Sequence, residues 1–304
     1  MNTIGIIDIG SNTVHCDVFR TDERTIRTIG SKGVVNRLGV HLAGSRTIPA
    51  HKITEAVNII RSLMAYARNK GARTTHVFAT SILRKAANRK TFIHKVKAGC
   101  GADIDVISTG QECLCVERAA RFFIRPTNDR ILLVDIGGGS TEFIIFDKNR
   151  TYVRKSYAYG LSYVKGRAGA GEVTAVRERA RISRFFDAKV RLFAKGVLQY
   201  KCKKIIVTSS IAKVMAGAKY GGMVTIADGH RKTISRDNIT ALQKKVLSKP
   251  HTVNIAPAQR ELVYIGTYFF HHLLQAFHKK HFYVGPYSVR EGYVLESLEL
   301  GSGI

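Results

Sequence analysis

The chain has few of the features that mark secreted, disulfide-bonded or membrane-embedded proteins. Its cysteines, five in all, are odd in number and irregularly spaced, so they do not predict a disulfide framework. The Cys113 and Cys115 pair lacks the second pair that a zinc site would need. No apolar run approaches a membrane span, and the N-terminus has no basic segment followed by an apolar one. These absences predict a soluble, cytoplasmic protein without a membrane partner.

Acidic residues are also scarce. Asp and Glu number 22 against 49 Lys and Arg, which gives a formal net charge of +27. Such a field attracts polyanions, so nucleic acid, anionic membrane, polyphosphate and nucleotides are all candidate ligands. The general protein chemistry of the source organism explains the excess equally well. The net charge therefore favours an anionic ligand, but it does not indicate which of these candidates is bound.

Proline is rare at 5 residues, whereas glycine is common at 27, and this balance predicts tight turns in a chain that is not of low complexity. The length of 304 residues fits two domains of medium size. Hydrophobic residues make up 45% of the chain, which is enough to form buried cores.

The most informative pattern is an internal repeat. Residues 4–19 read IGIIDIGSNTVHCDVF, and residues 131–146 read ILLVDIGGGSTEFIIF. Equivalent positions in the two copies are 127 residues apart, and they pair Asp8 with Asp135, Gly10 with Gly137, and Phe19 with Phe146. Each copy predicts a β-hairpin, in which two strands rich in β-forming residues flank a turn of small polar residues.

The turns of these hairpins are suited to phosphate. Glycine lets backbone N–H groups approach a ligand closely, and successive N–H groups form concave anion sites. Further hydroxyl donors come from Ser11, Thr13, Ser140 and Thr141. The aspartate at the end of each incoming strand, Asp8 or Asp135, would repel a bare phosphate and is better placed to hold a magnesium ion that bridges to it. Neither a G-x-x-x-x-G-K-[ST] loop nor a G-x-G-x-x-G loop after a strand occurs.

With these loops, the sequence resembles the exopolyphosphatase and guanosine pentaphosphate phosphohydrolase (Ppx/GppA) family of the actin and sugar-kinase superfamily. The segments DIGSNT at 8–13 and DIGGGSTE at 135–142 carry the resemblance. Three further segments agree in order: FATSILRKAAN at 78–88, ISTGQEC at 107–113 and SVREG at 288–292. The resemblance therefore spans nearly the whole chain.

The resemblance implies an α/β fold of two related ribonuclease H-like domains that flank a catalytic cleft. We expect the first domain over 1–124 and the second over 125–290, with the boundary where RPTND breaks a helix. A last helix, at about 290–304, is expected to pack back on the first domain. The length suggests the short two-domain type, and members of this family are often homodimers.

Several patterns of apolar residues fit such an α/β fold. A helix is predicted at 50–69, where the spacing of apolar residues is amphipathic. Short buried strands are predicted at 77–79 and 104–107, and further helices at 174–198, 236–248 and 257–278.

The resemblance also implies an active site. Glu112 would orient or deprotonate the water that attacks a terminal phosphoanhydride bond. Arg84 is expected to bind phosphate oxygens through its planar guanidinium. The terminal phosphates would be held by Asn12 and by Gly138, Gly139 and Ser140, next to Gly137. Magnesium, or alternatively manganese, would be held among Asp8, Asp135 and Glu142.

Two departures from the family pattern stand out. The two adjacent glutamates of the family are Gln111 and Glu112 here. The turn at 205–212, which is glycine-rich in the family, reads IIVTSSIA. The second departure puts a third contact to phosphate or nucleotide in doubt.

A basic helix is expected to bind the rest of a long substrate. Basic residues at helical spacing are Arg177, Arg181, Arg184, Arg191 and Lys195. An apolar stripe on the other side consists of Ile182, Phe186, Val190, Phe193 and Val197. A solvated helix face and a track for a polyanion explain this pattern equally well.

Three functions stay open at this point. The first is an exopolyphosphatase that acts on inorganic polyphosphate, and the second is a guanosine pentaphosphate 5'-phosphohydrolase. The third is a non-catalytic protein that binds polyphosphate or nucleic acid. The presence of Asp8, Asp135 and Glu112 favours an enzyme, and the basic chain favours polyphosphate. A sugar or acid kinase is less favoured, because nothing in the sequence indicates a dedicated adenosine pocket.

Overall fold

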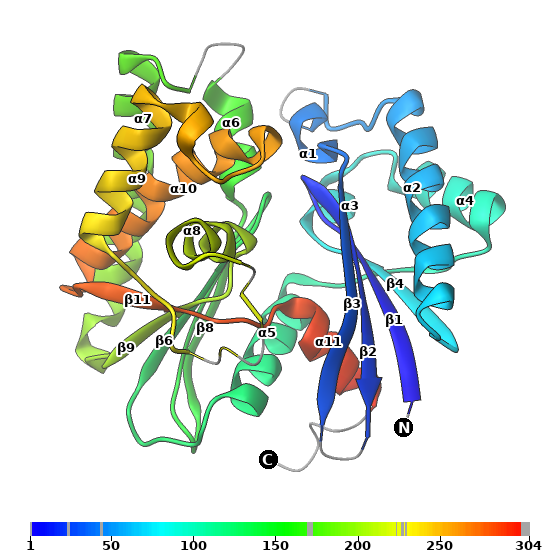
Figure 1. Cartoon of the computed structure of the whole chain (residues 1–304), viewed down its shortest axis with the longest axis horizontal. Helices are drawn as coiled ribbons and strands as arrows, with labels where there is room; N and C mark the ends of the chain where they lie inside the picture. The colour runs from blue at the N-terminus through cyan, green and yellow to red at the C-terminus, as the bar shows by residue number, and fades with distance from the viewer. Residues whose placement is uncertain are drawn as a thin grey trace.

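The structure is a computed structural model that describes residues 2–22, 25–42, 45–168, 173–222, 224–225, 228 and 230–298. Two separate sheets organise the chain, one in each half (Figure 1). In order across the first sheet, the strands are β3 (Ile26–Val35), β2 (Thr13–Thr21), β1 (Asn2–Ile9), β4 (Thr74–Ala79) and β5 (Ile104–Val106). The second sheet has the order β10 (Thr233–Ser235), β11 (His281–Val284), β9 (Lys204–Val207), β6 (Ile131–Ile136), β7 (Thr141–Phe146) and β8 (Thr151–Tyr157).

The two sheets share one topology, which confirms the predicted pair of related α/β domains. In both, a three-stranded antiparallel meander is extended by two parallel strands, β4 beside β1 and then β5, and β9 beside β6 and then β11. The second sheet has one further strand, β10, which is antiparallel to β11 at the edge. The predicted repeat holds at the level of register, since Asp8 lies opposite His15 in β2 and Asp135 lies opposite Glu142 in β7. The strands β1 and β6 run to Ile9 and Ile136, up to the glycine that opens each turn.

Helices α2 (Ala50–Asn69) and α4 (Arg89–Cys100) cover the outer face of the first sheet (Figure 1). Helix α2 is amphipathic as predicted, and it buries Ile53, Ile60 and Leu63 at the spacing of helical turns. Two short helices, α1 (Leu38–His41) and α3 (Ser81–Lys85), follow strands β3 and β4. They begin close to the two predicted phosphate loops.

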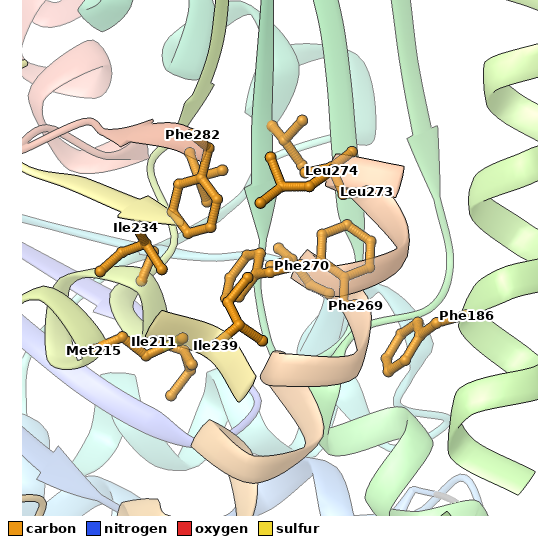
Figure 2. Close-up of a cluster of buried hydrophobic side chains, with 14 of the residues drawn as sticks. Phe186, Ile211, Met215, Ile234, Ile239, Phe269, Phe270, Leu273, Leu274 and Phe282 are labelled. Atoms are coloured by element: carbon orange, nitrogen blue, oxygen red, sulfur yellow. The ribbon is translucent and has the colours of Figure 1, made fainter. Parts of the chain in front are cut away.

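The second half has a larger core, formed by its sheet and the helices packed on it. These helices are α6 (Leu161–Ala168), α7 (Val176–Val197), α8 (Ser210–Tyr220), α9 (Arg236–Ser248) and α10 (Pro257–Ala276), with 3-10 turns at Leu198–Tyr200 and Pro250–Thr252. Figure 2 shows Phe269, Phe270 and Phe282 in this core, where the Phe270 ring lies edge-on to Phe269 and tilted against Phe282. None of the described helices combines the length and the apolar character that a membrane span requires.

Helices α5 (Thr109–Phe123) and α11 (Val289–Ser297) lie between the two sheets (Figure 1). The core around them draws buried side chains from both sheets, including Phe78 of β4 and Leu133 of β6. Helix α11 thus contacts the first half, at β1, as well as α5. Since α5 also carries Glu112 in its first turn, the helix that joins the halves positions the predicted catalytic residue.

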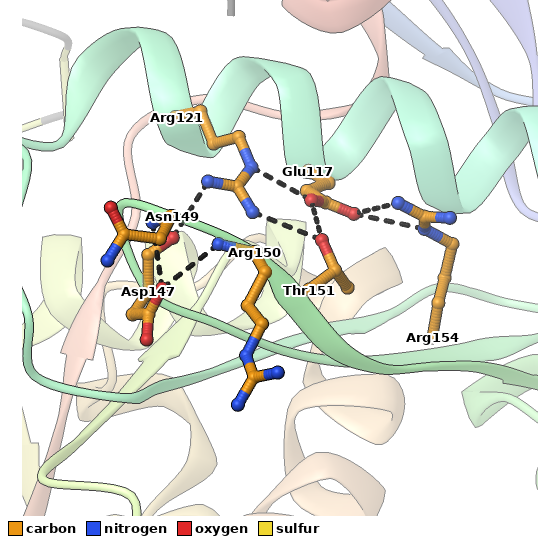
Figure 3. Close-up of polar contacts among 7 residues, drawn as sticks. All are labelled: Glu117, Arg121, Asp147, Asn149, Arg150, Thr151 and Arg154. Carbon is orange, nitrogen blue, oxygen red and sulfur yellow. Dashed lines mark hydrogen bonds and ion pairs between the residues drawn. The ribbon is translucent and has the colours of Figure 1, made fainter.

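A buried carboxylate fixes α5 to the second sheet (Figure 3). Glu117 accepts hydrogen bonds from Arg121 on α5 at 2.8 Å, from Arg154 on β8 at 2.5 Å, and from the Thr151 hydroxyl. Arg121 also donates to the carbonyl oxygen of Asp147 at 2.8 Å. These donors hold the pKa of Glu117 below its usual range, even though burial alone would raise it.

We expect Glu117→Gln to lower the free energy of unfolding by about 3 kcal/mol, because two buried or half-buried arginines would lose their counter-charge. The stabilisation by a carboxylate with a lowered pKa is present above the unfolded pKa and is lost as the pH falls. The deficit should therefore shrink in acid, which denaturant titrations at pH 7 and pH 4 would measure. As a control, Asp103→Asn breaks the exposed pair with Lys97 and should cost less than about 1 kcal/mol. A loss at Glu117 no larger than this control would contradict a structural role for the network.

Candidate active site

The turns of the two hairpins face one another between the halves. The first loop is Gly10–Asn12, between β1 and β2, and the second is Gly137–Ser140, between β6 and β7. A Cβ atom placed on Gly139 would lie 2.7 Å from the Ser11 hydroxyl of the first loop and 2.6 Å from the Ser81 hydroxyl of α3. A side chain at this position would have to displace both hydroxyls, so the two predicted phosphate loops lie against each other.

The carbonyl oxygens of the first loop are held by the segment that follows β3. Ser11 O accepts from the N–H of Gly39 at 2.6 Å, and Asn12 O accepts from the N–H groups of Asn36 and Arg37, both at 2.9 Å. In a trans peptide the C=O and the N–H point in opposite directions, so the bound carbonyl of Ser11 turns the Asn12 N–H away from Gly39. Among the described residues, no acceptor is bound to the N–H of Ser11 or Asn12.

The second loop is held in the same way. Gly137 O and Gly138 O accept from the N–H groups of Leu161 and Tyr163 at the start of α6, at 2.9 and 3.0 Å. Gly139 O accepts from Lys85 Nζ at 2.6 Å. The following N–H groups, those of Gly138, Gly139 and Ser140, have no acceptor within the described part of the chain. Both loops thus present unpaired N–H groups, which is the arrangement of a nest for anions.

The side chains predicted to bind phosphate differ in their burial and in their hydrogen bonds. Ser11 and Ser140 are buried within the loops. Asn12 donates from its side chain to the Thr13 hydroxyl at 3.2 Å. The Thr141 side chain is fully buried and donates to the Tyr159 carbonyl oxygen at 2.7 Å, so its hydroxyl supports the loop and is not free for a ligand. The Thr141 hydroxyl, which was expected to contact phosphate, is thus bound within the protein.

Four carboxylates crowd the base of the two loops. Burial raises the pKa of Asp8 to about 6, and the neighbouring Asp135 adds to the rise. Burial also raises the pKa of Asp135, and it raises the pKa of Glu142 well above the usual range, with Glu112 and Asp135 as further causes. Glu142 accepts a hydrogen bond from Ser156 at 2.7 Å. Burial and mutual repulsion therefore favour the neutral form of these carboxyl groups, and a bound cation would favour their ionised form.

Two cations that we did not predict lie beneath the aspartates. Arg290 of α11 binds Asp17 of β2 through its Nε and lies 3.5 Å from Asp8. Lys213 of α8 donates to the Pro286 carbonyl oxygen at 2.8 Å, and its charge opposes the rise in the pKa of Asp135. Arg290 belongs to the SVREG segment, which could have pointed to it, whereas no motif marks Lys213.

Glu112 is buried at the start of α5 and pairs with Arg84. The guanidinium of Arg84 contacts Glu112 Oε2 at 2.6 Å and the Ile107 carbonyl oxygen at 2.8 Å. Burial raises the pKa of Glu112 to about 7, while Arg84 opposes the rise and Asp135 and Asp8 add to it. A carboxylate with this pKa is poised to take a proton near neutral pH. Arg84, which is expected to bind phosphate, thus also contacts Glu112, and its contact with phosphate stays a prediction.

The two departures from the family pattern have structural explanations. Gln111 forms a capping box with Ser108, accepting from the Ser108 N–H at 2.8 Å, so this position caps α5. In the T-S-S-I turn, Ser209 caps α8 and donates to the Ile136 carbonyl oxygen at 2.8 Å. Both residues therefore support elements of the site through hydrogen bonds within the protein.

The residues present fit a divalent cation that is shared with a ligand. Asp8 Oδ1 is buried with no hydrogen-bond partner among the described residues. Within the same residues, no three His, Cys, Asp or Glu side chains converge on one point as a metal site does. Magnesium is commonly held by one or two carboxylates with waters and substrate phosphates, which suits such a partial set.

The predicted basic helix is α7. Its apolar stripe, from Ile182 to Val197, is buried as expected. The five predicted basic residues are all exposed. Arg191 pairs with Asp187 at 2.6 Å and Arg181 lies 3.8 Å from Glu178, whereas Arg177, Arg184 and Lys195 have no acidic partner among the described residues.

Comparison with known proteins agrees with this geometry. The family model described as the Ppx/GppA phosphatase family matches residues 17–300. The chain belongs to this family. Its fold is similar to the crystal structure of an exopolyphosphatase from Cytophaga hutchinsonii, with a TM-score of 0.85, 19% identity and 98% of each chain covered.

Curated relatives of this Ppx/GppA member match over part of their length. Exopolyphosphatase 1 of Mycobacterium leprae is 29% identical over 142 residues, which cover 46% of this chain and 41% of the relative. The guanosine-5'-triphosphate,3'-diphosphate pyrophosphatase of Photobacterium profundum is 27% identical over 139 residues, or 46% of this chain and 28% of the relative. The aligned stretch thus spans less than half of either relative.

Proposed function

We propose that this Ppx/GppA phosphatase is an exopolyphosphatase, which hydrolyses the terminal phosphoanhydride bond of inorganic polyphosphate. One observation carries the proposal. The two loops face one another with carbonyl oxygens that are bound from behind, and five of their N–H groups have no acceptor among the described residues. The Glu112 carboxyl group, whose pKa is raised, lies near them. Phosphoryl transfer needs positioning and neutralisation of oxygen charge more than covalent help, and the N–H groups supply both.

Each group has a distinct role in this proposal. The N–H groups of Ser11, Asn12 and the second loop would bind the terminal phosphates. Glu112 would orient the attacking water and accept its proton, and Arg84 would keep the Glu112 carboxylate in place through the 2.6 Å contact. A positioned general base contributes about 10²–10⁴-fold to the rate.

A divalent cation would be held near Asp8 and Asp135, with Glu142 behind them. When bound, magnesium or manganese neutralises phosphate oxygen charge and relieves the repulsion among the carboxylates. Arg290 and Lys213 already offset part of that charge from below, which keeps Asp8 and Asp135 in position.

Two other functions are separable by experiment. A relative carries the name of a guanosine-5'-triphosphate,3'-diphosphate pyrophosphatase, so guanosine pentaphosphate is the second candidate substrate. A non-catalytic polyanion-binding protein is disfavoured, because a binding site for anions has no need of a buried, high-pKa carboxylate such as Glu112.

The proposal is tested by phosphate release from long-chain polyphosphate, guanosine pentaphosphate and ATP, each with magnesium and with a chelator. We expect metal-dependent release from polyphosphate well above that from the two nucleotides. Faster release from guanosine pentaphosphate would select the second candidate. No release from any substrate, with tight binding of polyphosphate, would select the binding protein.

The basic face of α7 supports a long substrate over a short one. We expect replacement of Arg177, Arg184 and Lys195 by Gln to weaken binding of long-chain polyphosphate and to reduce its logarithmic salt slope by about 2. Hydrolysis of tripolyphosphate should not change, because so short a chain does not leave the loops. An equal loss of charge at the exposed Arg27, Arg68 and Arg73 serves as the control. If both triple variants weaken polyphosphate binding equally, the effect comes from the net charge of the protein, and α7 does not form a binding track for the substrate.

A further inference from the structure

Lys85 joins the two halves of the molecule at the second phosphate loop. It is the last residue of α3 in the first half, and its Nζ donates to the carbonyl oxygens of Gly139 at 2.6 Å and Ala158 at 3.3 Å in the second half. The ammonium also lies 5.6 Å from the ring centroid of Tyr163 on α6. One cation of the first half is thus surrounded by three groups of the second.

The bond to Gly139 differs from the other bonds that hold this loop. Gly137 O and Gly138 O are bound by backbone N–H groups of α6, which belongs to the same half as the loop. Gly139 O is bound by a side chain from the opposite half. Because C=O and N–H point in opposite directions across a trans peptide, fixing Gly139 O turns the Ser140 N–H away from Lys85. The direction of that N–H therefore depends on contact between the halves.

The preceding residue ties the same short helix to the general-base candidate. Arg84 binds Glu112 at 2.6 Å, so two consecutive cations of α3 reach Glu112 and the second loop. Burial and Arg84 lower the pKa of Lys85, while Glu112 and Glu142 oppose this effect. The carboxylates of the site therefore help to keep the ammonium charged.

We propose that Lys85 is a positioning residue that couples contact between the two halves to the orientation of the second phosphate loop. The kinetic consequence of this inference rests on the proposed function. The structural consequence does not, because the contact is present without substrate.

The test compares Lys85→Met with Lys85→Arg, and with Lys90→Met as a control of equal charge change at an exposed position on α4. We expect Lys85→Met to lower kcat on polyphosphate about tenfold to hundredfold with little change in KM, because the charge-assisted hydrogen bond that orients the second loop toward the charge of the transition state would be lost. Lys85→Arg should restore most of the rate. In small-angle X-ray scattering, the radius of gyration of ligand-free Lys85→Met should exceed that of the wild type, and Lys90→Met should match the wild type in both measurements.

Several results would overturn the inference. Wild-type kinetics in Lys85→Met would do so, and so would a raised KM with an unchanged radius of gyration, since Lys85 would then bind substrate directly. If the wild-type protein releases no phosphate from any substrate, the proposed function fails, and scattering alone decides on Lys85. A larger radius in Lys85→Met would still support the contact, and an equal radius would reject it.

Discussion

Replacing Glu112 by Gln should reduce phosphate release from polyphosphate by about 10²–10⁴-fold while leaving the substrate bound. The amide oxygen of Gln can still accept from Arg84, which contacts this position at 2.6 Å, so the fold of the site should persist. The substitution removes one negative charge from a site that binds anions, so the dissociation constant for polyphosphate should stay the same or fall. Single-turnover kinetics and equilibrium binding on the same preparation would measure both quantities.

The matched control is Glu55→Gln on α2, where the carboxylate is partly exposed and pairs with Lys52. It should leave turnover and binding as they are. Wild-type turnover in Glu112→Gln would refute the assignment of Glu112. Loss of binding along with turnover would show that Glu112 supports the loops and is no general base.

The pH dependence of the wild-type protein should report the same group. Burial raises the pKa of Glu112 to about 7, and a general base must be deprotonated to act. The value of kcat/KM should therefore rise with pH through about 7 and then level off. Arg84→Met removes the cation that opposes the rise in this pKa, so it should move the rising limb to higher pH. A profile that falls over the same range would assign the titrating group the role of an acid.

The paired hairpins could be predicted because strands and turns both have recognisable sequence patterns. Alternating and continuous apolar runs bounded by glycine predict strands, and the 127-residue offset relates one hairpin to the other. The register shows how far the copies have diverged, because His15 occupies the place that Glu142 holds in the second hairpin. Burial lowers the pKa of His15 to about 3, so this position holds a neutral imidazole in the first half and a carboxyl group with a raised pKa in the second.

The contacts between elements could not be predicted from these signals. Arg84 and Glu112 are 28 positions apart, Lys85 and Gly139 are 54 apart, and Arg290 and Asp17 are 273 apart. Periodicity describes neighbours on one helix or strand, and it has no information about pairs that meet only when two sheets pack together. The family resemblance and the chemistry of the guanidinium predicted a phosphate role for Arg84, but they gave no sign of its contact with Glu112. Lys85 lies within the FATSILRKAAN segment but was not singled out there, and Lys213 lies in none of the motif segments, so both were missed.

The SVREG segment is one of those that carry the family resemblance, and the structure gives a physical reason for its glycine. Gly292 lies on α11 where that helix crosses α5, and a Cβ atom at this position would lie 1.8 Å from the Cys115 carbonyl oxygen. The Cys115 carbonyl carbon and Cα would also be within 2.3 and 2.7 Å. These are backbone atoms, so no side-chain rotation could relieve the overlap, and the two helices would have to move apart.

Gly292→Ala should therefore lower the free energy of unfolding by about 3 kcal/mol or more, which corresponds to a fall of roughly 10 °C in the melting temperature. Gly196→Ala on α7 is the matched control, because no heavy atom lies within 4 Å of its added Cβ. This second change should stabilise the protein by about 0.5–1 kcal/mol, through the better helix propensity of alanine. Thermal and denaturant unfolding would give opposite signs for the two substitutions.

The same change should impair the site before it unfolds the protein. Cys115 follows Glu112 within one turn of α5, and Arg290 precedes Gly292 on α11, so separating the helices displaces both the general-base candidate and the cation beside Asp8. We expect kcat of folded Gly292→Ala, measured well below its melting temperature, to fall with Tm. A variant that is destabilised yet turns over at the wild-type rate would show that the site tolerates movement of α5. In that case the helix pair would serve the stability of the fold alone.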